Sequence, residues 1–187
     1  MNKNYVQAHA EDRNTYKNFE KITSKQWQVY YYLLSISYYN SQEVEDHRYV
    51  YKNNFNVSAA ARFLGISRPT IYRAIEALET YNLVRESKMK NAYYIYSRGF
   101  VEINKDTLSG LIQYSKICPK NIDLLRVYLI LKKLDLLAEN KQERCFTKRN
   151  LIKLLGHDTT TQQNYLDVLE YLALLRYLNL VDFTSHT

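Results

Sequence analysis

The stretch NVSAAARFLGISRPTIYRAIEALETYNLVRES, Asn56–Ser87, decides the fold of this chain. Ser58 is predicted to cap a short helix over residues 59–64, because a serine side chain accepts hydrogen bonds from the free N–H groups of a helix start. Gly65 follows and supplies the left-handed residue that ends such a helix. The segment therefore reads as a short helix that stops at a tight turn.

A second helix is predicted over residues 68–81, with Ser67 as its N-cap. Ile71, Ile75 and Leu78 recur at positions i, i+4 and i+7, which places them on one buried stripe. Two short helices joined by about three residues that include glycine form a helix-turn-helix unit. In DNA-binding proteins the second helix of this unit enters the major groove.

A β-hairpin is predicted directly after the second helix. Residues 82–87, 88–91 and 92–96 read as strand, turn and strand. The order Leu-Gly-Ile-Ser-Arg-Pro-Thr (64–70), then an amphipathic helix, then Leu-Val-Arg (83–85), resembles the winged helix-turn-helix superfamily over residues 24–98. That resemblance implies a DNA-binding fold in which the hairpin is the wing.

A longer helix is predicted upstream of this motif, over residues 25–40. Its aromatic and aliphatic side chains recur at helical spacing, and we interpret them as a core stripe rather than a ligand cage. The stripe consists of Trp27, Tyr30, Tyr31, Leu34 and Tyr38.

Charge is distributed unevenly along the chain. Its 187 residues include 26 Lys and Arg against 19 Asp and Glu, a net charge of +7. Residues 57–73 contain three arginines and no acid, and the predicted wing adds further basic residues. We place the acids Glu76 and Glu79 on the back of the second helix. The basic excess then lies where a helix-turn-helix meets phosphates, which favours a polyanionic partner.

The sequence offers little for catalysis, metal binding or membrane insertion. The four histidines are scattered without HxH or HExxH spacing, and the two cysteines are far apart. Four glycines are too few for a phosphate-binding loop fold, and no apolar run approaches the roughly 20 residues of a membrane span. We expect a cytoplasmic protein that is not an enzyme and needs no cofactor.

The C-terminal half repeats the same order of elements. We predict helices over residues 122–138, 148–155 and about 160–177, with Thr147 as a cap, a short strand at 145–146 and another at 179–183. Leu155-Gly156 matches Leu64-Gly65, and Asn179-Leu-Val181 matches Asn82-Leu-Val84. The repeat predicts a second unit of the same kind.

The predicted fold class is therefore mainly α with short β-hairpins (α+β), in two tandem winged-helix domains. The alternative is that residues 111–187 form an unrelated helical dimerisation region. The expected boundaries are a flexible arm at 1–22, a first domain at 23–98, a linker at 99–119 with a strand at 100–103, and a second domain at 120–187 whose wing is short or absent.

Arg73 is the first candidate for reading DNA bases. It points away from the buried stripe of the second helix, and its guanidinium fits guanine O6 and N7. Thr70 fits a thymine methyl group or a phosphate, while Tyr72 can donate to the DNA backbone. The remaining candidates in this domain lie at the helix start or on the wing, and they are Ser67, Arg68, Pro69, Lys88, Lys90 and Asn91.

The second domain carries different residues at the matching places. Thr161 and Asn164 stand where Thr70 and Arg73 do, and asparagine suits adenine. Lys148 and Arg149 are candidate phosphate contacts. The stripe Val168–Tyr171–Leu175 looks like an additional apolar face, so we also expect this domain to pack against the first domain or against another subunit, as in a homodimer.

Double-stranded DNA is thus the expected partner. The first hypothesis is a sequence-specific transcriptional regulator of a mobile element. The second is an accessory protein that binds a plasmid replication origin or a conjugative-transfer origin, because the tandem architecture is similar to plasmid replication initiators and conjugative-element proteins. A protein-interaction module is the third.

Overall fold

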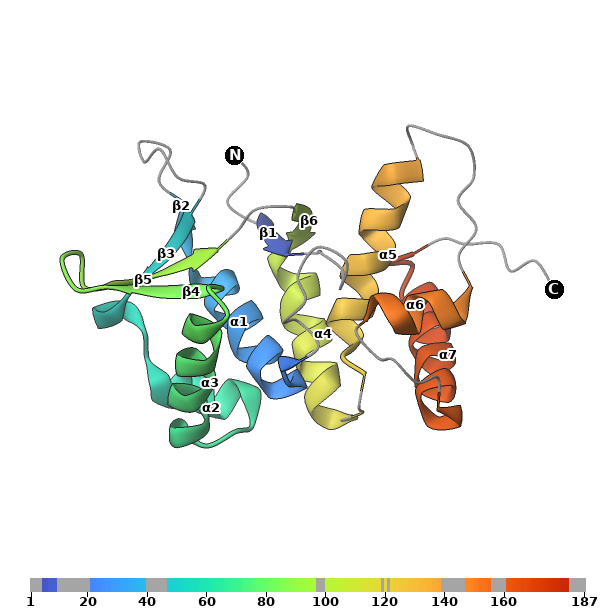
Figure 1. Ribbon diagram of the computed structural model, residues 1–187, viewed down its shortest axis with the longest axis horizontal. Helices are drawn as coiled ribbons and strands as arrows, with labels where there is room; N and C mark the ends of the chain where they lie inside the picture. Colours follow the sequence, from blue (N-terminus) through green and yellow to red (C-terminus); the bar gives the residue numbers. More distant parts are fainter. Residues whose placement is uncertain are drawn as a thin grey trace. The chain divides into compact units, whose positions relative to one another are not determined.

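The computed structural model describes residues 5–9, 21–39, 47–96, 100–118, 120, 122–138, 147–155 and 161–181. These residues belong to two compact units, and the boundary in the chain lies between Pro119 and Lys120. Figure 1 labels their helices and strands. Each unit is described by itself below.

Unit 1 combines helices with two small antiparallel sheets. One sheet has the strand order β2-β3-β5-β4, and the other pairs β1 with β6. In chain order the elements are β1 (Tyr5–His9), α1 (Ser24–Ile36), β2 (Tyr38–Tyr39), β3 (His47–Tyr51), the 3-10 turn η2 (Lys52–Asn54), α2 (Val57–Leu64), α3 (Arg68–Thr80), β4 (Val84–Ser87), β5 (Ala92–Tyr96), β6 (Phe100–Asn104) and α4 (Lys105–Ile117).

The helix-turn-helix forms as the sequence predicts, with one correction. Asn56 is the N-cap of α2, and its side chain accepts from the Ala59 N–H, so the helix begins two residues before the predicted start at residue 59 and Ser58 lies inside it. Gly65 has φ +66° and ends the helix. Ser67 caps α3 by accepting from the Thr70 N–H.

The core of unit 1 lies between α1 and α3. Trp27, Tyr30 and Tyr31 are at most 2% exposed, and Ile71 and Leu78 on α3 are fully buried. In Figure 1, α1 lies between α3 and α4, and the β4–β5 hairpin runs above α3 toward the left of the view. Burial of this apolar face holds α3 and leaves its opposite face in solvent.

The predicted helix over residues 25–40 is shorter in the structure. It ends at Ile36, because Ser37 adopts an extended backbone and its hydroxyl donates to the Leu34 carbonyl. Tyr38 therefore belongs to β2 and is 53% exposed, so its assignment to the core stripe was wrong.

The predicted linker and part of the predicted arm have regular structure. Residues 5–9 of the expected arm form β1, which pairs antiparallel with β6. Most of the expected linker forms β6 and α4, and residues 100–103 are a strand as anticipated. The Gln113 side chain on α4 donates to the Phe63 carbonyl over 2.9 Å, so α4 helps to hold the end of α2.

Unit 2 contains α5 (Leu124–Ala138), α6 (Lys148–Leu154) and α7 (Gln162–Tyr177). Val168, Tyr171 and Leu175 are at most 2% exposed. The prediction that they form an exposed partner face was wrong, because they pack inside the unit with residues of α5 and α6. They are its core.

The predicted repeat agrees with the structure at one position and differs from it at another. Asn82 and Asn179 follow α3 and α7 with φ of 58° and 53°, and the next residue of each donates to a carbonyl in the last turn. However, residues 155–161 separate α6 from α7, whereas residues 65–67 separate α2 from α3. The predicted strand from Asn179 is absent from residues 179–181, and its remainder and residues 145–146 lie outside the described residues.

The observed class is α+β and mostly helical, as predicted. Within the described residues, no helix is both long and apolar enough to cross a membrane.

Candidate nucleic-acid interface

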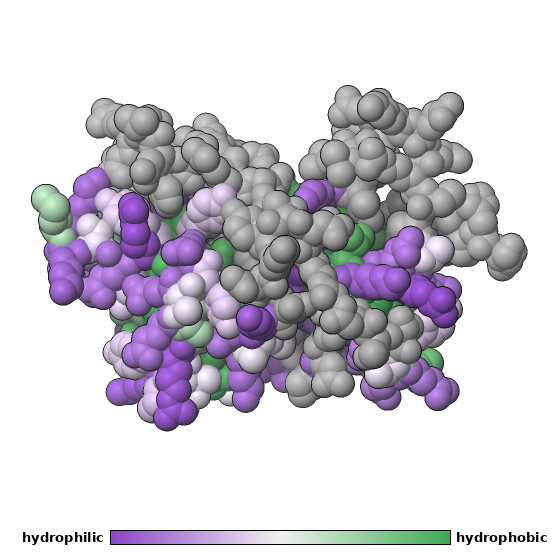
Figure 2. Space-filling view, in the orientation of Figure 1, coloured by the Kyte–Doolittle hydropathy of each residue, from purple (hydrophilic) through white to green (hydrophobic). Residues whose placement is uncertain are grey.

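Helix α3 presents a polar face to solvent. Arg68, Pro69 and Arg73 are exposed and Tyr72 is 50% exposed, while Ile71 and Ile75 of the same helix are buried. This division follows from the 3.6-residue period and places Arg73 opposite the core. Figure 2 shows hydrophilic residues, in purple, over α2, α3 and the hairpin.

The start of α3 is arranged by two hydroxyl groups. The Ser67 Oγ accepts from the Thr70 N–H at 3.3 Å and lies 2.8 Å from the Thr70 Oγ1. Arg68 is the first residue of this helix and its side chain is exposed there. A helix N-terminus carries a partial positive charge and free N–H groups, so this end of α3 suits a phosphate.

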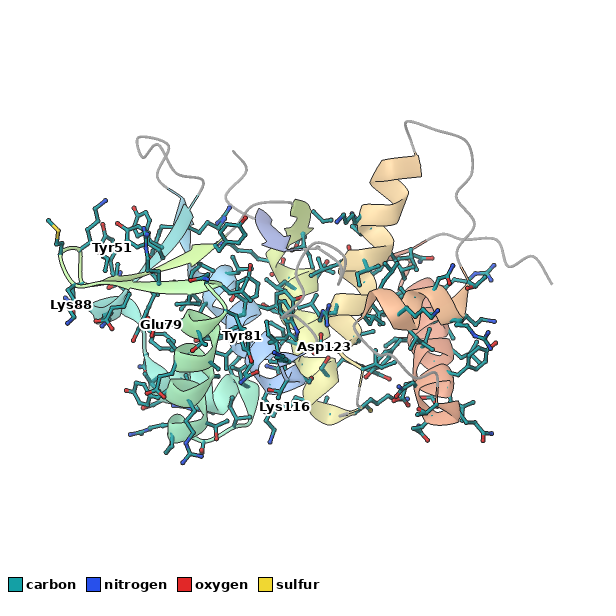
Figure 3. All side chains as sticks on the ribbon, viewed as in Figure 1. Tyr51, Glu79, Tyr81, Lys88, Lys116 and Asp123 are labelled. Atoms are coloured by element: carbon teal, nitrogen blue, oxygen red, sulfur yellow. The ribbon has the colours of Figure 1, made fainter. Side chains whose placement is uncertain are left out.

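The hairpin after α3 carries two exposed lysines at its end. Lys88 and Lys90 lie in the four-residue turn, and Met89 between them is 99% exposed. Figure 3 shows Lys88 at the end of the hairpin. The turn thus carries two exposed lysine side chains at the end of the hairpin.

Asn91 has a structural role that the sequence did not indicate. Its φ is 47°, and its side-chain amide donates to the Asn53 Oδ1 over 3.0 Å. The Lys52 N–H donates to the Asn91 carbonyl over 2.9 Å. Asn91 therefore closes the turn and ties it to η2, and this geometry gives its predicted DNA contact no support.

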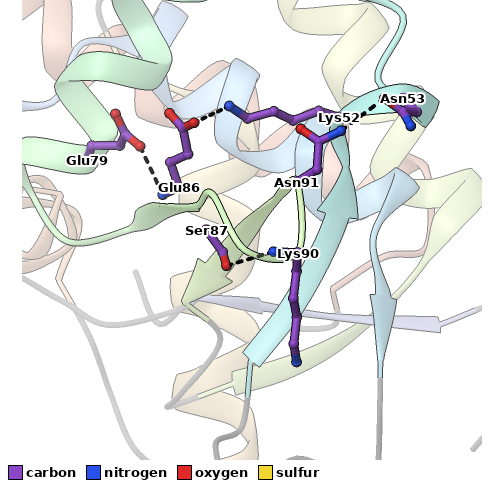
Figure 4. Close-up of polar contacts among 7 residues, drawn as sticks. All are labelled: Lys52, Asn53, Glu79, Glu86, Ser87, Lys90 and Asn91. Carbon is purple, nitrogen blue, oxygen red and sulfur yellow. Dashed lines mark hydrogen bonds and ion pairs between the residues drawn. The ribbon is translucent and has the colours of Figure 1, made fainter.

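A charged network joins the hairpin to α3 and η2 (Figure 4). The Glu79 carboxylate accepts from the Glu86 N–H over 3.0 Å, and the Glu86 carboxylate forms an ion pair with Lys52. The hydrogen bond from Lys52 lowers the pKa of Glu86, and the same bond raises the pKa of Lys52. These three side chains thus link the wing to α3 and to η2.

Tyrosines line the sheet beneath the basic side chains. The Lys52 Nζ lies 4.9 Å from the Tyr93 ring centroid, and the Arg85 guanidinium and Lys90 Nζ lie 5.5 and 5.7 Å from the Tyr94 ring centroid. Burial raises the pKa of the Tyr93 hydroxyl, which stays protonated at neutral pH. These contacts favour positions of the cations above the sheet.

Sequence reasoning missed the network because its members come from separate elements. Lys52 follows β3, Glu79 lies in the last turn of α3 and Glu86 lies in β4. A helical wheel describes one helix, so it cannot show a carboxylate that reaches a strand. The placement of Glu76 on the back of α3 was wrong, because Glu76 is exposed and lies one turn from Arg73.

Unit 2 does not reproduce this surface. Its N-cap Thr161 corresponds to Ser67, since both accept from the N–H three residues later. The predicted match of Asn164 with Arg73 was therefore shifted, and the structure buries Asn164 to 7% exposure. Its side chain is directed into the unit and away from the solvent that a base contact requires.

Asp167 stands at the position that corresponds to Arg73 when the two N-caps are aligned. It is 2% exposed and accepts from Gln163, and the Lys120 Nζ lies 3.5 Å from its carboxylate. Burial lowers the pKa of Lys120, but its bond to Glu170 and the charge of Asp167 outweigh burial, and the net shift is upward. A buried, paired carboxylate replaces the exposed arginine.

The remaining predicted residues of unit 2 lie on α6. Arg149 is exposed, and the Lys148 Nζ lies 5.6 Å from the Tyr165 ring centroid. They belong to a helix of seven residues, and the exposed part of α7 beside them includes Tyr165 and Leu166. The basic helix-and-hairpin surface is a property of unit 1.

Groups of three or more His, Cys, Asp or Glu residues able to hold a metal ion do not occur among the described residues.

Comparison with known proteins agrees with the geometry of unit 1. The family model described as "Bacterial regulatory protein, Fis family" matches residues 51–78. The match runs from the last residue of β3 through α2 and most of α3, so it covers the helix-turn-helix and not the hairpin or unit 2. It supports assignment of this segment to the helix-turn-helix DNA-binding superfamily. Neither a curated protein nor a solved structure matches the chain.

Proposed function

We propose that the chain is a sequence-specific, double-stranded DNA-binding protein that acts as a transcriptional regulator. In this proposal α3 lies in the major groove and the hairpin follows the adjacent phosphates. The observation that carries it is the exposed position of Arg73 on a helix whose opposite face is buried. A bidentate guanidinium on such a helix is the commonest way to recognise guanine.

The dimensions of α3 fit this role. A helix of 13 residues is about 20 Å long and about 10–12 Å wide with its side chains, and the major groove is about 12 Å wide. Within the exposed surface of unit 1, basic side chains lie at both ends of the proposed contact: Arg68 at the helix start, and Lys88 and Lys90 on the hairpin. They would neutralise phosphates on either side of Arg73.

Substitution of Arg73 tests the proposal. A preferred site is first selected from random duplexes, and binding of Arg73→Ala is then measured on that site and on a scrambled duplex. We expect a loss of about 1–3 kcal/mol on the selected site, roughly 5- to 150-fold, and a much smaller loss on the scrambled one. Arg73→Lys keeps the charge but not the bidentate geometry, so it should also lose discrimination.

Lys25→Ala is the matched control, because Lys25 is exposed on α1, the helix that packs on the buried side of α3. Equal weakening of Arg73→Ala on both duplexes would reduce Arg73 to a phosphate contact and contradict base reading. Selection of no preferred site by the unaltered protein would contradict the proposed function itself. Recovery of bound genomic fragments at promoters would support regulation, and recovery at a replication or transfer origin would contradict it.

A further inference from the structure

Glu76 is an acid on a mainly basic surface. It is exposed, and it follows Arg73 by three residues, so the two side chains emerge from the same face of α3. The neighbouring exposed cations on α2, α3 and the hairpin are Arg62, Arg68, Arg73, Arg85, Lys88 and Lys90. A carboxylate here opposes phosphate binding and needs an explanation.

The other two carboxylates of α3 and the hairpin already have structural partners. Glu79 accepts from the Glu86 N–H, and Glu86 pairs with Lys52. The Glu76 carboxylate forms no hydrogen bond or ion pair with any described residue, and neither does the Arg73 guanidinium. Both groups therefore remain available to a ligand in the same groove.

We propose that Glu76 is a specificity-determining residue that accepts a hydrogen bond from a cytosine amino group. This inference rests on the proposed function. In the major groove a carboxylate finds a donor in the cytosine N4 amino group, whereas guanine N7 and O6 and thymine O4 are acceptors that repel it. Adenine presents its N6 amino donor beside the N7 acceptor, which repels a carboxylate. Arg73 and Glu76 then form a pair of readers, one for guanine and one for cytosine.

The spacing of the pair matches neighbouring base pairs. Three residues advance about 4.5 Å along a helix, and successive bases are about 3.4 Å apart along a strand. With Arg73 on a guanine, Glu76 reaches the next base pair. Its negative charge also penalises duplexes that present only guanine or thymine acceptors at this position, which raises specificity at some cost in affinity.

The experiment compares Glu76→Gln and Glu76→Ala with Asp106→Asn. Asp106 is exposed in the first turn of α4, so its substitution changes the net charge by the same amount as Glu76→Gln. Sites are selected from random duplexes for each variant, and affinities are measured on the cytosine site and on duplexes with the other three bases there. Circular dichroism checks that each variant is folded.

We expect Glu76→Ala to lose about 5- to 100-fold in discrimination at one position and to bind scrambled DNA more tightly. Glu76→Gln should shift the preference at that position from cytosine to adenine, because the amide can pair with adenine N6 and N7. Asp106→Asn should keep the original motif. An unchanged motif in both Glu76 variants overturns the inference, while Arg73→Ala still loses base discrimination if the proposed function holds.

Discussion

Replacement of Lys88 and Lys90 by alanine tests how the hairpin contributes to binding. Both side chains are exposed in the turn, whereas Lys52 of the neighbouring η2 is held in an ion pair with Glu86. The Lys90 N–H donates to the Ser87 Oγ, a bond from the backbone that alanine retains. The double variant should therefore remove two cations and leave the turn intact.

The magnitude follows from counterion release. Each phosphate neutralised contributes about 0.9 to the slope of log K against log salt, so two lysines in contact contribute about 1.8. Between about 50 and 200 mM salt the unaltered protein should thus lose roughly 12-fold more affinity than the double variant. Loss of the Lys90 contact with the Tyr94 ring should lower the free energy of unfolding by no more than about 0.5–1 kcal/mol, because the site is exposed.

Fluorescence anisotropy on a specific and a scrambled duplex, over a series of salt concentrations, measures this slope. The slope should fall by about 1–2 units on both duplexes, because phosphates carry no sequence information. Lys25→Ala on α1 should leave it unchanged, and thermal unfolding should show that both variants are folded. A slope equal to that of the unaltered protein would refute the hairpin as a phosphate contact.

Two further predictions concern stability. Gly65→Ala should lower the free energy of unfolding of unit 1 by about 1–2 kcal/mol in a denaturant titration, because the position has φ +66° and the new Cβ would lie 2.6 Å from the Lys116 Cε. Gly65→Asn should lower it less, because asparagine tolerates the left-handed region better than alanine does. An equal loss of unfolding free energy in both variants would contradict backbone strain as its cause. Glu86→Gln should destabilise the protein at neutral pH. The pKa of Glu86 is lowered by Lys52, so its contribution is present above the usual carboxyl pKa and is lost as pH falls through the lowered value. In urea titrations at acid pH the unaltered protein and Glu86→Gln should therefore have the same free energy of unfolding. A difference in unfolding free energy that persists at low pH would refute the ion pair as its source.

Local signals in the sequence determined the helix-turn-helix. Gly65 and Ser67 act through their own backbone conformation and the nearest N–H groups, so their roles do not depend on the rest of the fold. The buried stripe of α3 likewise follows from helical periodicity. These features predicted the candidate face around Arg73. The α2 cap shows the limit of such signals, because Asn56 and Ser58 are both good capping residues and the structure uses the first.

Only the tertiary structure determines which polar side chains form contacts within the fold and which remain in solvent. Glu79, Glu86 and Lys52 meet because β3 and β4 both pair with β5 while α3 ends beside them, and Glu76, one turn earlier on α3, is left in solvent. In unit 2, tertiary packing likewise buries Asn164 and Asp167, which lie on the face of α7 that packs into the core of the unit. Periodicity locates a residue on its own helix, but partners far apart in the chain determine whether that face meets water or protein. The physical reason is that burial and charge pairing depend on these long-range contacts, which local propensity does not encode.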